Sequence, residues 1–298
     1  MKTPVPEFII TFRSRSFGRF LLLLGSVLTG LLAACSTPQS RPEFSPLEFE
    51  AIETLQNSRA LAFQVLESTG TIELRRNEEG STSFDSCALD LWRDHANFAL
   101  RLRKFGERFL WVGSDGSDWW VFELASEPTR LVVLPLGVEG ALNLGAEESL
   151  LGPRKLLQLS GLLPIDPEAR CEQLHLTEEG LISFVLVSQV EGGWNRMRWE
   201  VDRKRLLPSR IEALDQQGEV LYWARLNAYE PIPARDLPIG AWPQFARKVF
   251  IKDLSGEVDV RIFFNNPNAR GTRIKPSLFD LQKLLAAFKP SKVEYLAE

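Results

Sequence analysis

The chain has 298 residues, a formal net charge of −4 and a hydrophobic fraction of 44%. The acidic balance argues against nucleic acid as a partner, and the hydrophobic fraction is ample for a packed core. The length allows one large β-rich domain or two smaller ones and does not decide between them.

The first 34 residues have the pattern of a secretory signal, in which basic residues precede a short apolar run and small residues. The apolar run, residues 20–34, is shorter than the ~20 residues that cross a membrane as a helix, so we disfavour the alternative of an uncleaved transmembrane helix. The run closes with Leu32, Ala33 and Ala34 before Cys35. The basic residues are Lys2, Arg13, Arg15 and Arg19.

The sequence Leu-Ala-Ala-Cys at positions 32–35 resembles the lipobox of bacterial lipoproteins. The resemblance implies that residues 1–34 are a signal peptide, that cleavage occurs before Cys35, and that acyl chains on Cys35 anchor the mature chain in a membrane. Three acyl chains suffice for stable anchoring. Because Ser36 rather than Asp follows, the resemblance also implies sorting to the outer membrane, with the protein facing the periplasm. Cleavage removes four basic residues and one acidic residue, which shifts the net charge to −7.

Residues 35–46 are rich in Ser, Pro and other polar residues, and we expect them to form a flexible tether between the lipid and the domain. We expect one β-rich domain from residue 47 to residue 298. The first half of residues 47–66 is predicted to be helical, because apolar residues recur there at near-helical spacing, and the last part fits a strand equally well.

A two-residue period replaces the helical one after Gly70 and predicts an antiparallel meander. The predicted strands are 71–76, 88–94, 97–104, 108–112 and 119–124. A second meander and a final hairpin are predicted from the same period and from Gly-containing turns. Their strands are 173–177, 182–189, 195–202, 209–215, 219–229, 248–254 and 258–265.

Two further helices are predicted. One begins near Pro153 and ends before Gly161, and the other spans residues 276–288 with leucines on one face. Neither is apolar all round, so each should cover a sheet. This many antiparallel strands predict an α+β, predominantly antiparallel fold whose sheet curls strongly.

Two stretches carry a family resemblance. Residues 98–122, in which an Asp-Gly turn leads into Trp119-Trp120-Val121-Phe122, resemble the central hairpins of LolA/LolB-like lipoprotein carriers. Residues 201–220 resemble the later strands of that family. The resemblance implies an open, incomplete β-barrel with covering helices, whose concave apolar face holds acyl chains.

LolA is soluble, so the predicted anchor favours the membrane-bound LolB type, which acts through an apolar residue on a loop. Residues 134–138 are the loop-like apolar run that fits this part, and 231–243 is a second candidate.

The chain is rich in large apolar side chains that fit a ligand cavity. Trp120, Phe122 and Leu124 share one face of their predicted strand, and further strands add aromatic residues. The alternative is that all of them belong to an ordinary packed core. The predicted ligand-binding residues are Trp92, Trp111, Trp120, Phe122, Leu124, Met197, Trp199 and Tyr222.

The sequence offers no catalytic or metal-binding motif, so we expect neither an enzyme nor a cofactor or metal ion. The histidines, His95 and His175, fit solvated positions. Cys87 and Cys171 form a disulfide or remain two buried free thiols, and the sequence leaves both alternatives open.

Basic residues cluster along the first meander. We expect them on a solvated outer face of the sheet, with binding to lipid phosphates as the alternative. They are Arg93, Arg101, Arg103, Lys104 and Arg108.

Two functional hypotheses follow. The first is a membrane-anchored envelope lipoprotein that binds lipid or lipoprotein acyl chains in the concave sheet and releases them by movement of a lid helix. The second is a structural or protein-docking outer-membrane lipoprotein with a fully packed sheet and no ligand. An apolar cavity of several hundred Å³ favours the first, and native packing density throughout favours the second. The oligomeric state stays open.

Overall fold

The computed structural model describes residues 46–78, 81–135, 153–190, 193–253 and 258–296. Its helices are α2 (Pro46–Ala62), α3 (Pro153–Leu159), η2 (Ile239–Ala241), η3 (Pro276–Leu278) and α4 (Leu281–Phe288). Its strands are β1 (Val65–Glu78), β2 (Ser81–Asp94), β3 (Asn97–Lys104), β4 (Glu107–Ser114), β5 (Asp118–Glu123), β6 (Arg130–Pro135), β7 (Arg170–Leu176), β8 (Leu181–Val190), β9 (Gly193–Asp202), β10 (Pro208–Leu214), β11 (Val220–Pro231), β12 (Gln244–Asp253), β13 (Val258–Asn268) and β14 (Lys292–Tyr295). The predicted signal peptide and Cys35 lie outside the described residues.

All of the described strands form one sheet in the order β14-β6-β5-β4-β3-β2-β1-β13-β12-β11-β10-β9-β8-β7. Every neighbouring pair is antiparallel except β14 and β6, which are parallel. The predominantly antiparallel fold is therefore confirmed, and every predicted strand overlaps an observed one. The last hairpin joins the two meanders, because β13 pairs with β1 and β12 pairs with β11. β14 and β7 remain at opposite edges, so the sheet is open and does not close into a barrel.

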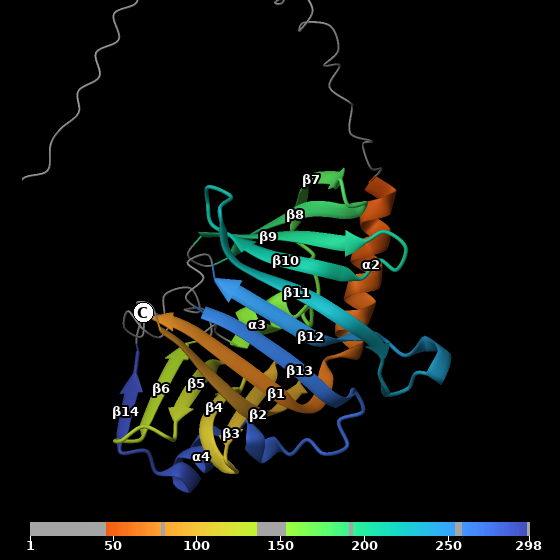
Figure 1. The fold of residues 1–298 in the computed structure, drawn as a ribbon. Helices are drawn as coiled ribbons and strands as arrows, with labels where there is room; N and C mark the ends of the chain where they lie inside the picture. Colours follow the sequence, from red (N-terminus) through yellow and green to blue (C-terminus); the bar gives the residue numbers. More distant parts are fainter. Residues whose placement is uncertain (1–45, 79–80, 136–152, 191–192, 254–257, 297–298) are drawn as a thin grey trace, which may run out of the picture. The chain divides into compact units, whose positions relative to one another are not determined.

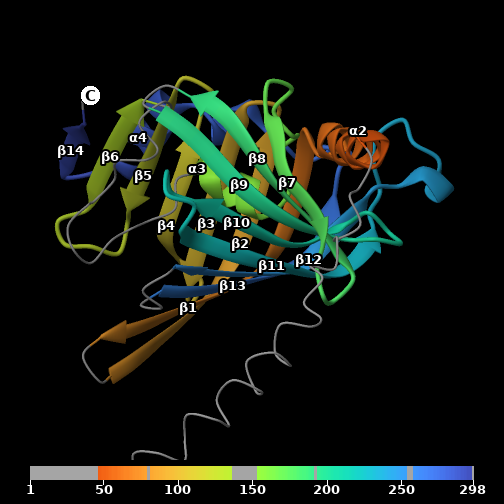
Figure 2. The ribbon, with the colours of Figure 1, turned by 90° about the horizontal axis from the view of Figure 1, so that it is seen from above.

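The sheet bends around α3 and encloses the main hydrophobic core. Figure 2 shows α3 between β3–β5 on one side and β8–β9 on the other. Residues from both halves of the sheet enter the same core, among them Phe98 of β3, Val121 of β5 and Trp199 of β9. This face, which we call the inner face, has the alternating apolar pattern of a half-buried sheet.

Helix α2 packs on the inner face across β8 to β12 (Figure 1). The Phe49 ring meets Phe184 of β8 edge to face at 5.4 Å between centroids, and Phe63, just after the helix, meets Phe245 of β12 in the same way at 5.5 Å. Ile52 of α2 is fully buried. The predicted N-terminal helix is thus confirmed, and it ends at Ala62.

The C-terminal segment covers the outer face of β4–β6. The side chain of Asp280 accepts a hydrogen bond from the Lys283 backbone and caps α4. Phe288, at the end of α4, packs against Phe122 and Trp111 at centroid distances of 5.0 and 5.5 Å. Strand β5 is therefore buried on both faces.

Strands β6 and β14 were not predicted. Leu134, which begins the apolar run considered as a LolB-type loop, lies in β6 opposite Trp119 and is 1% exposed. That residue therefore belongs to the core, and 136–138 lie outside the described residues.

Candidate functional site

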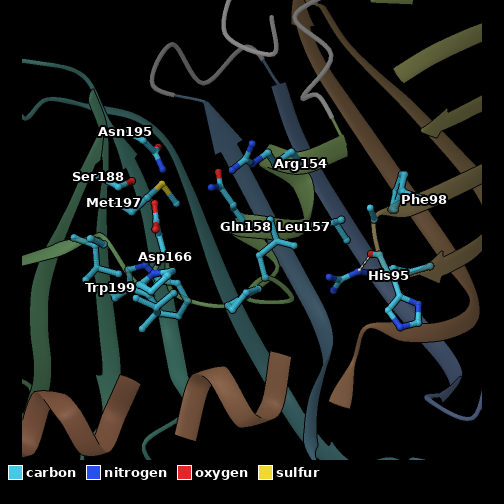
Figure 3. A pocket seen from close by; sticks show the side chains of 18 of the residues that line it. His95, Phe98, Arg154, Leu157, Gln158, Asp166, Ser188, Asn195, Met197 and Trp199 are labelled. Atoms are coloured by element: carbon cyan, nitrogen blue, oxygen red, sulfur yellow. Dashed lines mark hydrogen bonds between the residues drawn. The ribbon is translucent and has the colours of Figure 1, made fainter. Parts of the chain in front are cut away.

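A cavity of about 450 Å³ lies on the inner face between α3, the segment that follows it, and strands from both halves of the sheet (Figure 3). Ligand pockets commonly have about 300–1,000 Å³. The lining residues are Arg93, His95, Ala96, Phe98, Ser114, Arg154, Leu157, Gln158, Leu163, Pro164, Ile165, Asp166, Pro167, Ala169, Leu186, Ser188, Asn195, Met197 and Trp199.

One wall of the cavity is apolar because β8 and β9 turn paired side chains inward. Leu186 is opposite Met197, so both side chains point to the same face of the sheet. Trp199 continues this wall, and its ring stacks on Phe184 at 6.3 Å between centroids. Phe98 of β3 lines the cavity from the other half of the sheet.

The lining also includes polar side chains. Figure 3 shows Arg154 and Gln158 of α3 directed toward the side on which Ser188 and Asn195 lie. The amide oxygen Oδ1 of Asn195 accepts a hydrogen bond from Lys155 at 3.4 Å. A cavity with one apolar wall and several polar groups suits an amphipathic ligand.

Arg93 is a buried cation in the cavity wall. Its Nη1 donates to the Leu162 carbonyl at 2.8 Å and its Nε donates to the His95 carbonyl at 3.2 Å. Burial lowers the pKa of Arg93 to about 10, so the guanidinium stays charged at neutral pH. The sequence had grouped Arg93 with outward-facing basic residues, and the structure corrects this.

Arg101 and Arg103 do lie on the outer face, as expected for that cluster. Both pair with Asp90, at 2.9 and 3.2 Å. These contacts are ion pairs on the opposite face from the cavity.

The segment that closes the cavity is fixed at the C-terminal end of α3. Gly161 has a φ of +64° and ends the helix in a Schellman motif, in which its N–H donates to Gln158 and the Leu162 N–H donates to Leu157. Arg59 of α2 donates to the Gly161 carbonyl at 2.9 Å. Cations at this end also complement the helix dipole.

Arg59 is itself buried against aromatic rings. Its guanidinium lies 5.9 Å from the Phe63 ring centroid and 5.8 Å from that of Tyr229. Burial lowers the pKa of Arg59 and raises that of Tyr229 to about 12, an effect that the nearby guanidinium partly offsets. The Tyr229 hydroxyl donates to the Pro208 carbonyl at 2.6 Å.

The predicted ligand-binding residues are divided between the two faces. Met197 and Trp199 line the cavity. Tyr222 is half-buried against the main core and is not among the lining residues. The other predicted residues belong to or border a separate hydrophobic cluster under α4, on the outer face of the sheet. The prediction that they share one concave face with Met197 and Trp199 is therefore corrected. They are Trp92, Trp111, Trp120, Phe122 and Leu124.

The predicted residues are divided because the direction in which the sheet bends cannot be read from the strand pattern. Alternation along β5 places Trp120 and Phe122 on one face and Trp119 and Val121 on the other, but it does not say which face becomes concave. In the structure, Trp119 and Val121 face the inner core. Phe98 and Leu186 also line the cavity but were not predicted. They follow the same alternation along their strands, and their residue types do not distinguish them from ordinary core residues.

The remaining candidates form no reactive cluster in the described part of the chain. Cys87 of β2 and Cys171 of β7 are free thiols, and burial raises both pKa values, that of Cys171 to about 11. His95 pairs with Asp94 at 2.8 Å, and His175 contacts the Gln173 carbonyl at 2.6 Å. Within the described ranges no three His, Cys, Asp or Glu side chains gather as a metal site.

Comparisons with known proteins identify the fold. No protein family model matches the sequence, and no curated protein matches it. Among solved structures, a LolA superfamily protein from Nitrosomonas europaea superposes with a TM-score of 0.51 at 12% identity, over 78% of this chain and 96% of that one. The described domain has a LolA-like fold.

Two other structures agree with the LolA-like fold. A domain described as an outer membrane lipoprotein-sorting protein from Vibrio parahaemolyticus has a TM-score of 0.54 at 11% identity, over 78% of this chain and 97% of that one. A DUF1329 family protein from Desulfovibrio piger has a TM-score of 0.52 at 13% identity, over 79% and 98%. No helix in the described part of this chain has the length and apolar character to span a membrane.

Proposed function

We propose that the protein is an envelope lipoprotein that binds an acyl chain of a lipid or lipoprotein in the cavity beside α3 and takes part in lipoprotein or lipid trafficking. The observation that carries this proposal is the cavity of about 450 Å³ on the inner face of a LolA-like sheet, with Leu186, Met197 and Trp199 as its apolar wall. Burial of each CH₂ group of an acyl chain against such a wall contributes about 0.8 kcal/mol.

The polar part of the lining supports an amphipathic ligand rather than a purely apolar one. An acyl chain that lies along β8 and β9 leaves room for a polar head group in the rest of the cavity. Binding of this kind needs no catalytic group, so we propose a carrier or receptor rather than an enzyme.

The N-terminal sequence supports the envelope location. We propose that Cys35 carries the acyl anchor, that residues 35–46 tether the domain, and that the protein faces the periplasm from the outer membrane. The similarity to a lipoprotein-sorting domain is consistent with such a place. In this proposal the anchor attaches the protein to the membrane, and the cavity binds the transported lipid or lipoprotein.

Titration of the purified protein with a fluorescent acyl probe tests this function. We expect saturable binding, and we expect Met197→Trp to weaken it at least tenfold because the larger ring occupies the cavity. Met197→Leu, which nearly conserves volume, is the matched control and should bind like the wild type. Absence of probe binding by the folded wild type would favour the docking lipoprotein instead.

A further inference from the structure

Arg93 stands at a position that the strand pattern reserves for an apolar residue. Leu89, Leu91 and Arg93 alternate along the inner face of β2, and the two leucines are in the main core. The Arg93 side chain is only 5% exposed. A buried charge at such a position has a desolvation cost, which a partner of opposite charge offsets.

The partners of Arg93 within the described chain are neutral. Nε and Nη1 donate to backbone carbonyls, and Nη2 donates to no described residue. No described carboxylate forms an ion pair with it, and burial alone accounts for its lowered pKa. Among the described residues, therefore, the guanidinium has no carboxylate partner, and it brings a positive charge and an open donor to the wall of the cavity.

Three other titratable side chains belong to the described lining of the cavity. Arg154 is exposed and is a second cation of the lining. His95 is held by Asp94, outside the cavity's apolar wall. The one acidic residue of the described lining, Asp166, lies beside Met197 and Trp199, on the far side of the cavity from His95 (Figure 3).

We propose that the cavity selects single-chain amphiphiles with an anionic head group, a carboxylate or a phosphate. The head group binds at Arg93, and the chain lies against Leu186, Met197 and Trp199. This inference rests on the proposed function and adds the class of ligand. The Nη2 group, which donates to no described residue, can donate a charge-assisted hydrogen bond to a carboxylate or phosphate oxygen, and the opposite charges favour these head groups over a neutral hydroxyl.

Displacement of the fluorescent acyl probe by dodecanoate, dodecyl phosphate and dodecanol tests the inference. The two anionic amphiphiles should displace the probe at about tenfold lower concentration than the alcohol, as expected for a charge-assisted hydrogen bond in a buried site. Inorganic phosphate should not displace it, because it lacks the chain.

Three variants locate the selectivity. Arg93→Gln should reduce the preference for dodecanoate over dodecanol about tenfold, and Arg154→Gln about threefold. Asp166→Asn should strengthen the binding of the anions and leave the alcohol unchanged. Arg235→Gln, at an exposed position outside the cavity, is the charge-matched control and should change nothing. If Arg93→Gln fails to fold because it also loses the Leu162 contact, the other two variants decide.

The outcomes separate this inference from the proposed function. If dodecanol displaces the probe as well as dodecanoate does, the head-group selectivity is refuted and acyl binding stands. If inorganic phosphate alone displaces the probe, the site is a phosphate site and the inference is also overturned. If the wild type binds neither probe nor amphiphile, the proposed function itself fails.

Discussion

At the scale of single residues, buried polar side chains join the inner face of the sheet to the segments that cover it. Arg59 and Tyr229 join α2 to the β-sheet, and Arg93 joins β2 to the segment after α3. Each makes hydrogen bonds to backbone carbonyls, which keeps the desolvation cost of burial in check.

The raised pKa of Tyr229 predicts that the free energy of unfolding decreases at alkaline pH. Burial raises its pKa from 10.0 to about 12 in the folded state. Between these pH values the unfolded chain releases the phenolic proton while the folded chain retains it, so the free energy of unfolding falls as pH rises. Urea midpoints between pH 10 and pH 12 should therefore decline less steeply for Tyr229→Phe than for the wild type. Equal slopes would show that Tyr229 is not protected in the fold. Cys171 titrates in an overlapping range in both proteins and so cancels in the comparison.

At the scale of elements, β5 is the most completely buried strand of the first meander. Trp119 and Val121 enter the inner core, and Trp120 and Phe122 lie under α4. Trp120 packs over Gly113 of β4, where an added Cβ would meet the indole nitrogen at 2.5 Å. Glycine at that position makes room for the indole ring across the strand pair.

This arrangement predicts that Trp120→Ala separates stability from binding. Truncation of the fully buried indole should cost about 3–5 kcal/mol of unfolding free energy. The affinity for the acyl probe should stay within about twofold, since Trp120 does not line the cavity. Denaturant midpoints measured beside probe titrations check both parts. A variant that keeps its stability but no longer binds the probe would place the ligand under α4 instead.

The strands were predictable because a two-residue period is a local property, and the turns that bound them contain Gly, Asn or Asp. The sequence did not predict which face of each strand lies on the inner side of the bent sheet. Trp120 and Trp199 look alike in the sequence, yet Trp120 lies under α4, which begins more than 150 residues farther along the chain, and Trp199 faces the cavity. Arg93 illustrates the same limit, because only the bend of the sheet shows that its side of β2 is the inner one.

At the scale of the whole molecule, we propose that the anchor and the ligand-binding domain are separable. Cys35→Ala should remove the protein from the membrane fraction without changing its thermal unfolding, because the proposed acyl anchor is covalent and lies outside the domain. Fractionation at high salt, with probe binding as a check of the fold, measures this. Persistent membrane association of Cys35→Ala would mean that the domain itself binds the membrane.

The central claim is that the cavity beside α3 holds an acyl chain in the cell. Lipid extraction and mass spectrometry of the protein purified from envelopes test it most directly. We predict an acyl-chain compound near one equivalent per wild-type protein, and a much smaller amount in Met197→Trp at equal folded concentration. Equal amounts of lipid in both proteins, or none in the wild type, would contradict the account.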